Sequence, residues 1–72
     1  MKTYQERMKE TREDHDERQA DIASVLGVSR QQYNRWETGS YPLPVEKLME
    51  FCQYYNVSAD YILFGGEFKN LK

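Results

Sequence analysis

Hydrophobic residues recur three and four positions apart along most of the chain, and short stretches of glycine, proline and serine separate the periodic segments. Residues at these spacings share one face of a helix, so the pattern is typical of amphipathic helices. In segment 19–26, Ile22, Ala23 and Leu26 share a face, and Gly27 follows where a helix can end. The pattern predicts an all-α protein with five short helices.

Capping residues predict where these helices begin. Thr3 followed by Glu6, and Ser29 followed by Gln32, have the spacing of capping boxes, which start the first and third helices. The other predicted boundaries are Gln19 to Leu26 for the second helix, an end near Glu37 with Gly39 beyond it for the third, Pro44 as the first residue of the fourth, Ser58 as the cap of the fifth, and Gly65-Gly66 as the end of the compact part.

The same spacing predicts the side chains of the core. Val28 with Tyr33, and Val57 with Ile62, have the spacing of hydrophobic staples. The other predicted inward positions are Tyr4, Met8, Thr11, Arg12 and His15 in the first helix, Ile22, Ala23 and Leu26 in the second, Ser29, Trp36 and Glu37 in the third, and Val45, Leu48, Phe51 or Met49, Cys52 and Tyr55 in the fourth.

Segment 19–39 contains two short predicted helices with a glycine in the turn between them, which is typical of a helix-turn-helix. A helical wheel of the second of these helices turns amide and guanidinium groups away from the core. Such groups pair with adenine and guanine in the major groove. An ordinary solvated face is the alternative, although that would normally include Glu, Asp and Lys. The expected base-contacting residues are Arg30, Gln31, Gln32, Asn34 and Arg35.

The charge of the chain bears on the expectation that it binds DNA. The formal net charge of −2 is unusual for a nucleic-acid binder, because neutralising phosphates supplies much of the affinity. The charges are unevenly placed: residues 1–18 hold five basic and six acidic side chains, whereas residues 22–36 hold two arginines and no acidic residue. A local surface free of acidic residues can face DNA while the rest of the molecule repels it weakly.

Length and residue content argue against several other classes. The 72 residues suffice for one domain without a deep substrate cavity, and the sequence shows no paired carboxylates, activated nucleophile or phosphate loop, so we expect neither an enzyme nor a cofactor. One cysteine excludes an internal disulfide, and one histidine leaves no plausible zinc site. No apolar run approaches the roughly 18 residues of a membrane span, and the first residues lack a signal peptide's apolar stretch. We therefore expect a cytoplasmic protein without a membrane partner.

The chain resembles the lambda repressor/Cro-like helix-turn-helix family, also called XRE-type regulators, over about residues 4–65. The motifs that carry the resemblance are R-E-D-H-D, Q-x-x-I-A-x-x-L-G-V-S, Y-x-R-W-E-T-G, P-x-x-x-L and Y-Y-N-V-S-A-D-Y-I-L. The resemblance implies a compact five-helix bundle. It also implies a homodimer that binds a palindromic operator, with the third helix in the major groove.

The resemblance also suggests roles for individual residues. Gln19 matches a position that contacts a phosphate, and Arg12 and Glu37 match a pair that ties the first helix to the end of the third. The alternative for that pair is two solvated surface charges. With Gln19, we expect Arg18 and Ser29, at helix starts, to contact the DNA backbone. In this family the stretch after the fifth helix often contributes to dimerisation, so the candidate dimer residues are Phe64, Phe68 and Leu71. The alternative is that these residues belong to a frayed tail.

The sequence departs from the family pattern in two places. Glu17 and Arg18 stand where an apolar residue and a Thr or Ser cap are usual, and Asp16 with Gln19 is an alternative, earlier cap. The loop of residues 40–43 lacks the lysine or arginine that is common there. This absence puts minor-groove contacts in doubt and predicts modest affinity.

Residues 1–66 are therefore predicted to form a DNA-binding domain, followed by a short tail of residues 67–72. The leading hypothesis is a sequence-specific transcriptional regulator that acts as a repressor, of bacterial or phage origin. An antitoxin or a restriction-control protein with the same fold is one alternative. A protein-interaction module that has lost DNA binding is another; the acidic net charge favours it, and the acid-free face of the third helix argues against it.

Overall fold

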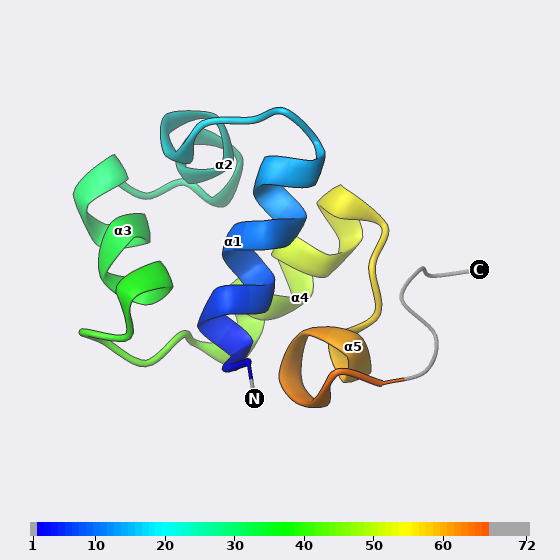
Figure 1. The fold of residues 1–72 in the computed structure, drawn as a ribbon. Coiled ribbons are helices and arrows are strands. Elements are labelled where there is room, and N and C mark those ends of the chain that lie inside the picture. Colours follow the sequence, from blue (N-terminus) through cyan, green and yellow to red (C-terminus); the bar gives the residue numbers. More distant parts are fainter. Residues whose placement is uncertain (1, 67–72) are drawn as a thin grey trace.

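The computed structural model describes residues 2–66, and within this range the chain forms five helices (Figure 1). The predicted all-α fold is confirmed. Residues 67–72, the predicted tail, lie outside the described residues. The helices are α1 (Tyr4–Asp14), α2 (Gln19–Leu26), α3 (Arg30–Thr38), α4 (Val45–Tyr55) and α5 (Ala59–Phe64).

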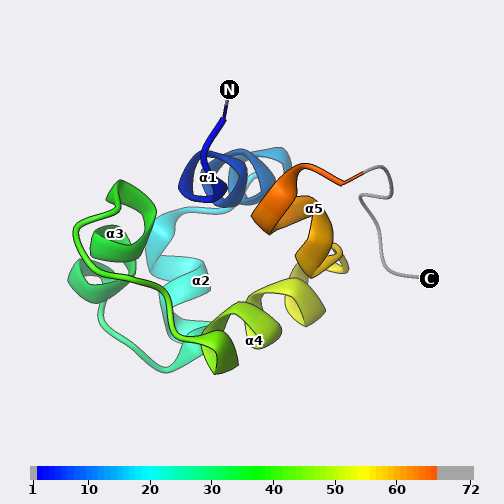
Figure 2. The ribbon, with the colours of Figure 1, turned by 90° about the horizontal axis from the view of Figure 1, so that it is seen from below.

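The five helices surround one core. α1 packs against α3 and α5, α2 packs against α3 and α4, and α4 contacts α5. Figure 2 shows α3 and α5 on opposite sides of the molecule, with α1 above them and α4 below. α1 therefore contacts both the second helix of the helix-turn-helix and the last helix of the bundle.

Every helix contributes a fully buried apolar side chain to this core. Met8, Ile22, Tyr33, Phe51 and Ile62, one from each helix, each have a relative exposure of 0%. Burying one such side chain contributes about 1.5–3 kcal/mol, so the bundle is stabilised by packing between helices more than by any one helix. The other buried apolar residues are Ala23, Leu26, Trp36, Leu48, Cys52, Tyr55 and Val57.

Three helices begin with the predicted side-chain caps. The Thr3 hydroxyl accepts the Glu6 N–H at 3.2 Å, and the Glu6 carboxylate accepts the Thr3 N–H at 2.8 Å, which completes the capping box of α1. Ser29 and Ser58 each accept the N–H three residues later, at 3.0 Å. These bonds satisfy amides that have no partner inside their own helix.

The turn between α2 and α3 is fixed by its backbone and by a side chain from α4. Gly27 has φ +70°, a left-handed conformation that ends α2 and that a residue with a Cβ adopts at a cost. Lys47 donates from Nζ to the Leu26 carbonyl at 2.7 Å, so one of the last carbonyls of α2 has a partner. A side chain of α4 thus contacts the end of α2 at this turn.

The alternative cap at Asp16 is wrong. Asp16 lies in the turn after α1 with φ +55°, and Arg18 is the residue that precedes α2. The Asp21 carboxylate accepts the Arg18 backbone N–H at 2.8 Å. The Asp21 carboxylate therefore binds the amide that precedes α2, and the Arg18 side chain has no acceptor with which to cap the first amides of the helix.

Some residues near helix ends differ from their predicted burial or helix boundary. Pro44 precedes α4 as its N-cap instead of opening the helix, and Val45 and Met49 are 67% and 54% exposed. The first turn of α4 extends past the core, and Leu48 is its first buried residue. Ser29 is exposed at the start of α3. His15 is exposed at the end of α1, although its ring contacts that of buried Tyr55 with the centroids 4.7 Å apart.

Candidate nucleic-acid interface

The two faces of α3 differ in chemistry. One face buries Tyr33, Trp36 and Glu37 against the rest of the bundle. The opposite face exposes polar side chains, and a shallow open hollow lies among them; it is lined by Arg30, Gln31, Asn34 and Arg35. Gln32 is half-buried at the flank of this face. The structure therefore brings four of the five expected base-contacting residues together on one surface, which is here called the polar face of α3.

The residues expected to contact the DNA backbone lie at the starts of α2 and α3. Ser29 is exposed and caps α3. The Arg18 side chain is 83% exposed, and its guanidinium lies 3.4 Å from the Asp21 carboxylate. Hydrogen bonds from the Arg18 backbone and side chain lower the pKa of Asp21, so a negative charge persists beside this cation. Arg18 is thus an exposed cation whose positive charge is partly offset by the Asp21 carboxylate.

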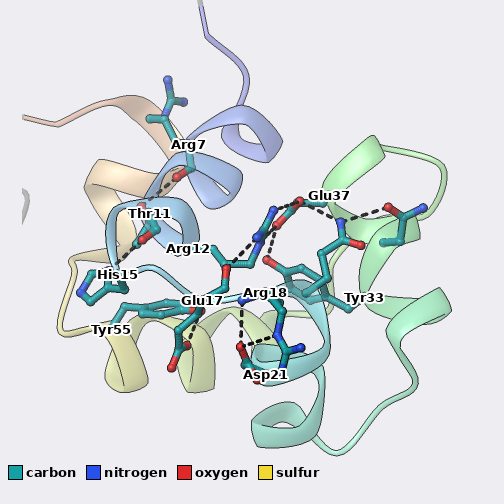
Figure 3. Close-up of polar contacts among 12 residues, drawn as sticks. Arg7, Thr11, Arg12, His15, Glu17, Arg18, Asp21, Tyr33, Glu37 and Tyr55 are labelled. Carbon is teal, nitrogen blue, oxygen red and sulfur yellow. Dashed lines mark hydrogen bonds and ion pairs between the residues drawn. The ribbon is translucent and has the colours of Figure 1, made fainter.

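A buried ion pair connects α1 to the end of α3. Arg12 donates from Nε to Glu37 Oε2 at 2.8 Å and from a terminal nitrogen to Oε1 at 3.1 Å (Figure 3). The two side chains are only 10% and 3% exposed. The pair expected from the family resemblance is therefore present, and its two-bond geometry is the arrangement that makes arginine–carboxylate pairs strong.

Glu37 also accepts hydrogen bonds from two neutral side chains. The Tyr33 hydroxyl donates to Oε2 at 2.6 Å, and Gln19 donates from Nε2 to Oε1 at 3.0 Å. Burial acts to raise the pKa of Glu37, but the hydrogen bonds from Arg12, Tyr33 and Gln19 outweigh it and hold the pKa below its ordinary value. Glu37 is therefore an ionised carboxylate with donors from α1, α2 and α3 around it.

The Gln19 side chain, which the family resemblance assigns to a phosphate contact, is hydrogen-bonded within the domain. Its Nε2 donates both to Glu37 and, at 3.0 Å, to Oδ1 of Asn34 on the polar face of α3. Its two amide hydrogens thus have partners within the chain. Its backbone N–H is in the first turn of α2, where helix amides have no partner within the helix.

Tyr41 is a neighbour of the polar face that sequence reasoning missed. Its ring centroid lies 5.4 Å from Cζ of Arg35, within the range of a cation–π interaction, and its backbone N–H donates to the Arg35 carbonyl at 3.2 Å. The loop of residues 40–43 therefore contributes an aromatic ring next to Arg35 although it carries no basic residue.

Two charged residues outside this surface have structural roles that the sequence did not indicate. Glu17 accepts from the hydroxyls of Tyr54 and Tyr55 at 2.6 and 3.0 Å, which connects the turn before α2 to α4. Arg7 donates to the carbonyls of Ile62 and Leu63 at 2.7 and 2.9 Å, which connects α1 to α5. Their partners lie 37 to 56 positions away in the chain, so no local pattern could reveal them.

Of the three expected dimer residues, the structure describes Phe64. Phe64, the last residue of α5, is 78% exposed, and it lines a groove together with Leu63 and the start of α1. Phe68 and Leu71 lie outside the described residues. Within residues 2–66, no helix combines the length and the apolar character that crossing a membrane requires.

A helix-turn-helix family model matches residues 8–62. The chain belongs to the helix-turn-helix family. This match spans α2, α3 and the turn between them, together with most of α1, α4 and α5. It confirms the family expected from the sequence. The members of this family are DNA-binding regulators, not enzymes.

The helix-turn-helix chain is also similar to a solved repressor structure and to two curated proteins. A crystal structure of the P22 c2 repressor with a synthetic operator matches with a TM-score of 0.83 and 27% identity, over 92% of this chain and all of that one. This similarity confirms the lambda repressor-like five-helix fold.

The first curated relative is YobD of Bacillus subtilis (strain 168), an uncharacterized HTH-type transcriptional regulator. It is 32% identical over 60 residues, which are 83% of this chain and 54% of that protein. The second is the antitoxin PezA of Streptococcus pneumoniae serotype 4. It is 36% identical over 64 residues, which are 89% of this chain and 39% of that protein. The chain thus spans about half of one relative and less of the other.

We predict that the Arg12–Glu37 pair is worth far more to stability than an exposed pair in the same helix-turn-helix domain. Arg12→Ala or Glu37→Ala leaves a buried charge unpaired, which costs about 3–5 kcal/mol. Lys2 and Glu10 form the matched control, with side chains 57% and 41% exposed and 2.6 Å between the charged atoms. Lys2→Ala should cost about 1 kcal/mol or less. Urea denaturation of the three variants measures these losses, and a loss near 0.5 kcal/mol for Arg12→Ala would contradict the prediction.

A second prediction concerns pH. The pKa of Glu37 is lower in the folded chain than its ordinary value of 4.5, so the ionised carboxylate stabilises the fold above that value. This contribution is lost as the pH falls below 4.5 and through the folded-state pKa. Glu37→Gln should therefore lower the free energy of unfolding most at pH 7, and the difference from wild type should shrink in acid.

Denaturation at a series of pH values checks this expectation, with exposed Glu13→Gln as the control. A difference between Glu37→Gln and wild type that stays constant from neutral to acidic pH would show that Glu37 is not the titrating group.

Proposed function

We propose that this helix-turn-helix domain is the DNA-binding part of a sequence-specific transcriptional repressor, which contacts the major groove of an operator through α3. The observation that carries the proposal is the polar face of α3: four amide or guanidinium side chains exposed together on a helix whose other face is buried. The similar P22 c2 structure, solved with a synthetic operator, supports it. Repression then requires no catalysis, because an occupied operator blocks transcription.

In this proposal, base contacts and backbone contacts come from different parts of the domain. The polar face of α3, with Gln32 at its flank, contacts base edges, where amides and guanidinium groups distinguish base pairs. The starts of α2 and α3 contact phosphates through the Arg18 side chain, the Ser29 hydroxyl and exposed backbone amides. These contacts set the register of α3 on the duplex.

The charge pattern limits the strength of non-specific binding. The cations placed to face DNA are Arg18, Arg30 and Arg35, and Arg18 has Asp21 beside it. Each phosphate neutralised contributes a slope of about 0.9 to the dependence of log K on log salt. Since Arg30 and Arg35 are assigned to base edges, Arg18 is the cation assigned to a phosphate, and the slope per domain should be about −1. Affinity should therefore depend more on base contacts than in a strongly basic domain.

An antitoxin is the second candidate function. The similarity to the antitoxin PezA favours it, since a larger share of this chain matches PezA than matches YobD. Both functions use the same operator contacts, and they differ in whether a second protein binds the rest of the surface. Co-purification of a toxin encoded beside this chain would favour the antitoxin.

The division between base and backbone contacts predicts different effects for two arginines. Arg35→Ala should cost about 1–3 kcal/mol on the best operator and relax the preference at one base position. Arg18→Ala should weaken all sequences alike and reduce the salt slope by about one. Titrations at several salt concentrations, with an operator selected from random duplexes and a scrambled duplex, measure both. Equal weakening of the two duplexes by Arg35→Ala would overturn the role of α3.

A homodimer on a palindromic operator predicts a fixed spacing of half-sites. Two α3 helices related by a two-fold axis contact half-sites about 34 Å apart, one turn of the duplex. Inserting about five base pairs between the half-sites turns one of them to the opposite side of the duplex, so affinity should fall to that of a single domain. The same five base pairs inserted outside the half-sites are the control, because they leave the spacing and the facing of the half-sites unchanged. Affinity unchanged by the five-pair insertion would contradict the two-fold arrangement.

A further inference from the structure

The guanidinium of Arg35 lies over the aromatic ring of Tyr41, at the edge of the polar face of α3. Cζ of Arg35 is 5.4 Å from the ring centroid, and both side chains are exposed, that of Tyr41 at 53%. A ring that meets the flat side of a guanidinium attracts it without taking an N–H group, because these donors point outward in the plane of the group. Tyr41 therefore holds Arg35 and leaves its hydrogen-bond donors available.

The end of α3 and the loop after it place this ring. Gly39, with φ +84°, ends α3 in the left-handed conformation, and the chain then turns back toward the helix. The Tyr41 backbone N–H donates to the Arg35 carbonyl at 3.2 Å. Pro42 follows directly, and a residue before proline is restricted to extended backbone conformations. The ring is thus tied to the same residue whose side chain it contacts.

The other arginine with a side-chain partner on the DNA-facing side is held in a different way. Asp21 accepts from Nε and a terminal nitrogen of Arg18, at 3.5 and 3.4 Å, so it occupies donors and offsets the positive charge. The ring of Tyr41 occupies no donor of Arg35 and adds no carboxylate to the surface. Arg35 is therefore the arginine whose position is restricted while its full donor edge can serve a ligand.

We propose that Tyr41 is a positioning residue that commits Arg35 to a guanine: it holds the guanidinium where two of its N–H groups reach O6 and N7 of that base in the major groove. This inference rests on the proposed function. Two parallel bonds from an arginine to these acceptors are the commonest specific contact between proteins and DNA.

An arginine held in this way distinguishes bases better than a mobile one. A long side chain loses rotamer freedom when it binds, and restricting it in the free protein avoids part of that cost. When the guanine is replaced, a mobile arginine can turn to a neighbouring phosphate, which attracts it in any sequence. The Tyr41 ring opposes this movement, so the wrong base leaves Arg35 without its partner. Tyr41 should therefore increase the preference for guanine and not affinity alone.

Two substitutions of Tyr41 test this role. Tyr41→Leu removes the ring and keeps an apolar side chain, whereas Tyr41→Phe keeps the ring and removes the hydroxyl. Binding is measured to the selected operator and to a copy in which adenine replaces the guanine at the position whose preference Arg35→Ala relaxes. Tyr41→Leu should reduce the ratio of the two affinities about two- to fivefold, which is what an exposed cation–π contact is worth. Tyr41→Phe should keep the wild-type ratio.

A double-mutant cycle shows whether Tyr41 acts through Arg35. In the Arg35→Ala background, Tyr41→Leu should have no further effect on the ratio, because the ring then has no guanidinium to hold. The matched control is Arg30→Ala, since Arg30 is an exposed arginine at the other end of the same face. In that background, Tyr41→Leu should reduce the ratio as much as it does in wild type.

Two results would overturn the proposal while the proposed function stands. One is that Tyr41→Leu weakens both duplexes equally although Arg35→Ala relaxes the preference, which would make Tyr41 a contact to the DNA backbone. The other is an effect of Tyr41→Leu on the ratio that persists in the Arg35→Ala background, which would mean that the ring itself contacts a base. If Arg35→Ala relaxes no preference, the proposed function fails and this inference with it.

The contact is also measured without DNA. In a nitrogen–proton correlation spectrum of the free protein, the Nε–H signal of Arg35 should shift in Tyr41→Leu, because the ring current is lost, and should stay near its place in Tyr41→Phe. The Arg30 signal should not move in either variant. Denaturation shows that each variant is folded under the binding conditions. An Arg35 signal that Tyr41→Leu leaves in place would overturn the positioning role.

Discussion

The carboxylate of Glu37 is the point on which the arrangement of this domain depends. It lies near the end of α3, almost fully buried, and accepts four hydrogen bonds from three helices. A buried charge without such partners would cost several kcal/mol, so any shift of α1, α2 or α3 that breaks these bonds is penalised. The polar face of α3 is therefore held at a fixed angle to the rest of the bundle by electrostatics as well as by packing.

Local features of the fold could be predicted from the sequence because their causes are local. The caps of Thr3, Ser29 and Ser58 join residues three apart, and the buried positions of α2 and α3 follow from helical spacing. Errors arose where the local pattern continues past the core, as at Val45, which has helical spacing but lies beyond the neighbouring helices.

The outward-facing residues of the site could be predicted from the sequence, but the contacts between their side chains and other segments could not. The wheel of α3 placed Asn34 and Arg35 outward, and both are exposed. The wheel carries no information about Gln19 beside Asn34 or Tyr41 beside Arg35, because these contacts depend on the angle between α2 and α3 and on the path of a loop. The Arg12–Glu37 pair, 25 positions apart, came from resemblance to a family and not from any pattern within the chain.

The separation of the two faces of α3 bears on how such a domain can diverge. The residues that α3 buries, Tyr33, Trp36 and Glu37, maintain the fold, whereas Arg30 and Gln31 are exposed on its opposite face and can be exchanged at little cost to stability. Mutation can therefore alter the outward residues one at a time while the bundle stays intact. Asn34 is the exception, because a replacement there must also suit Gln19. A lineage of such domains would thus change freely at some positions of α3 and in a correlated pair at this one.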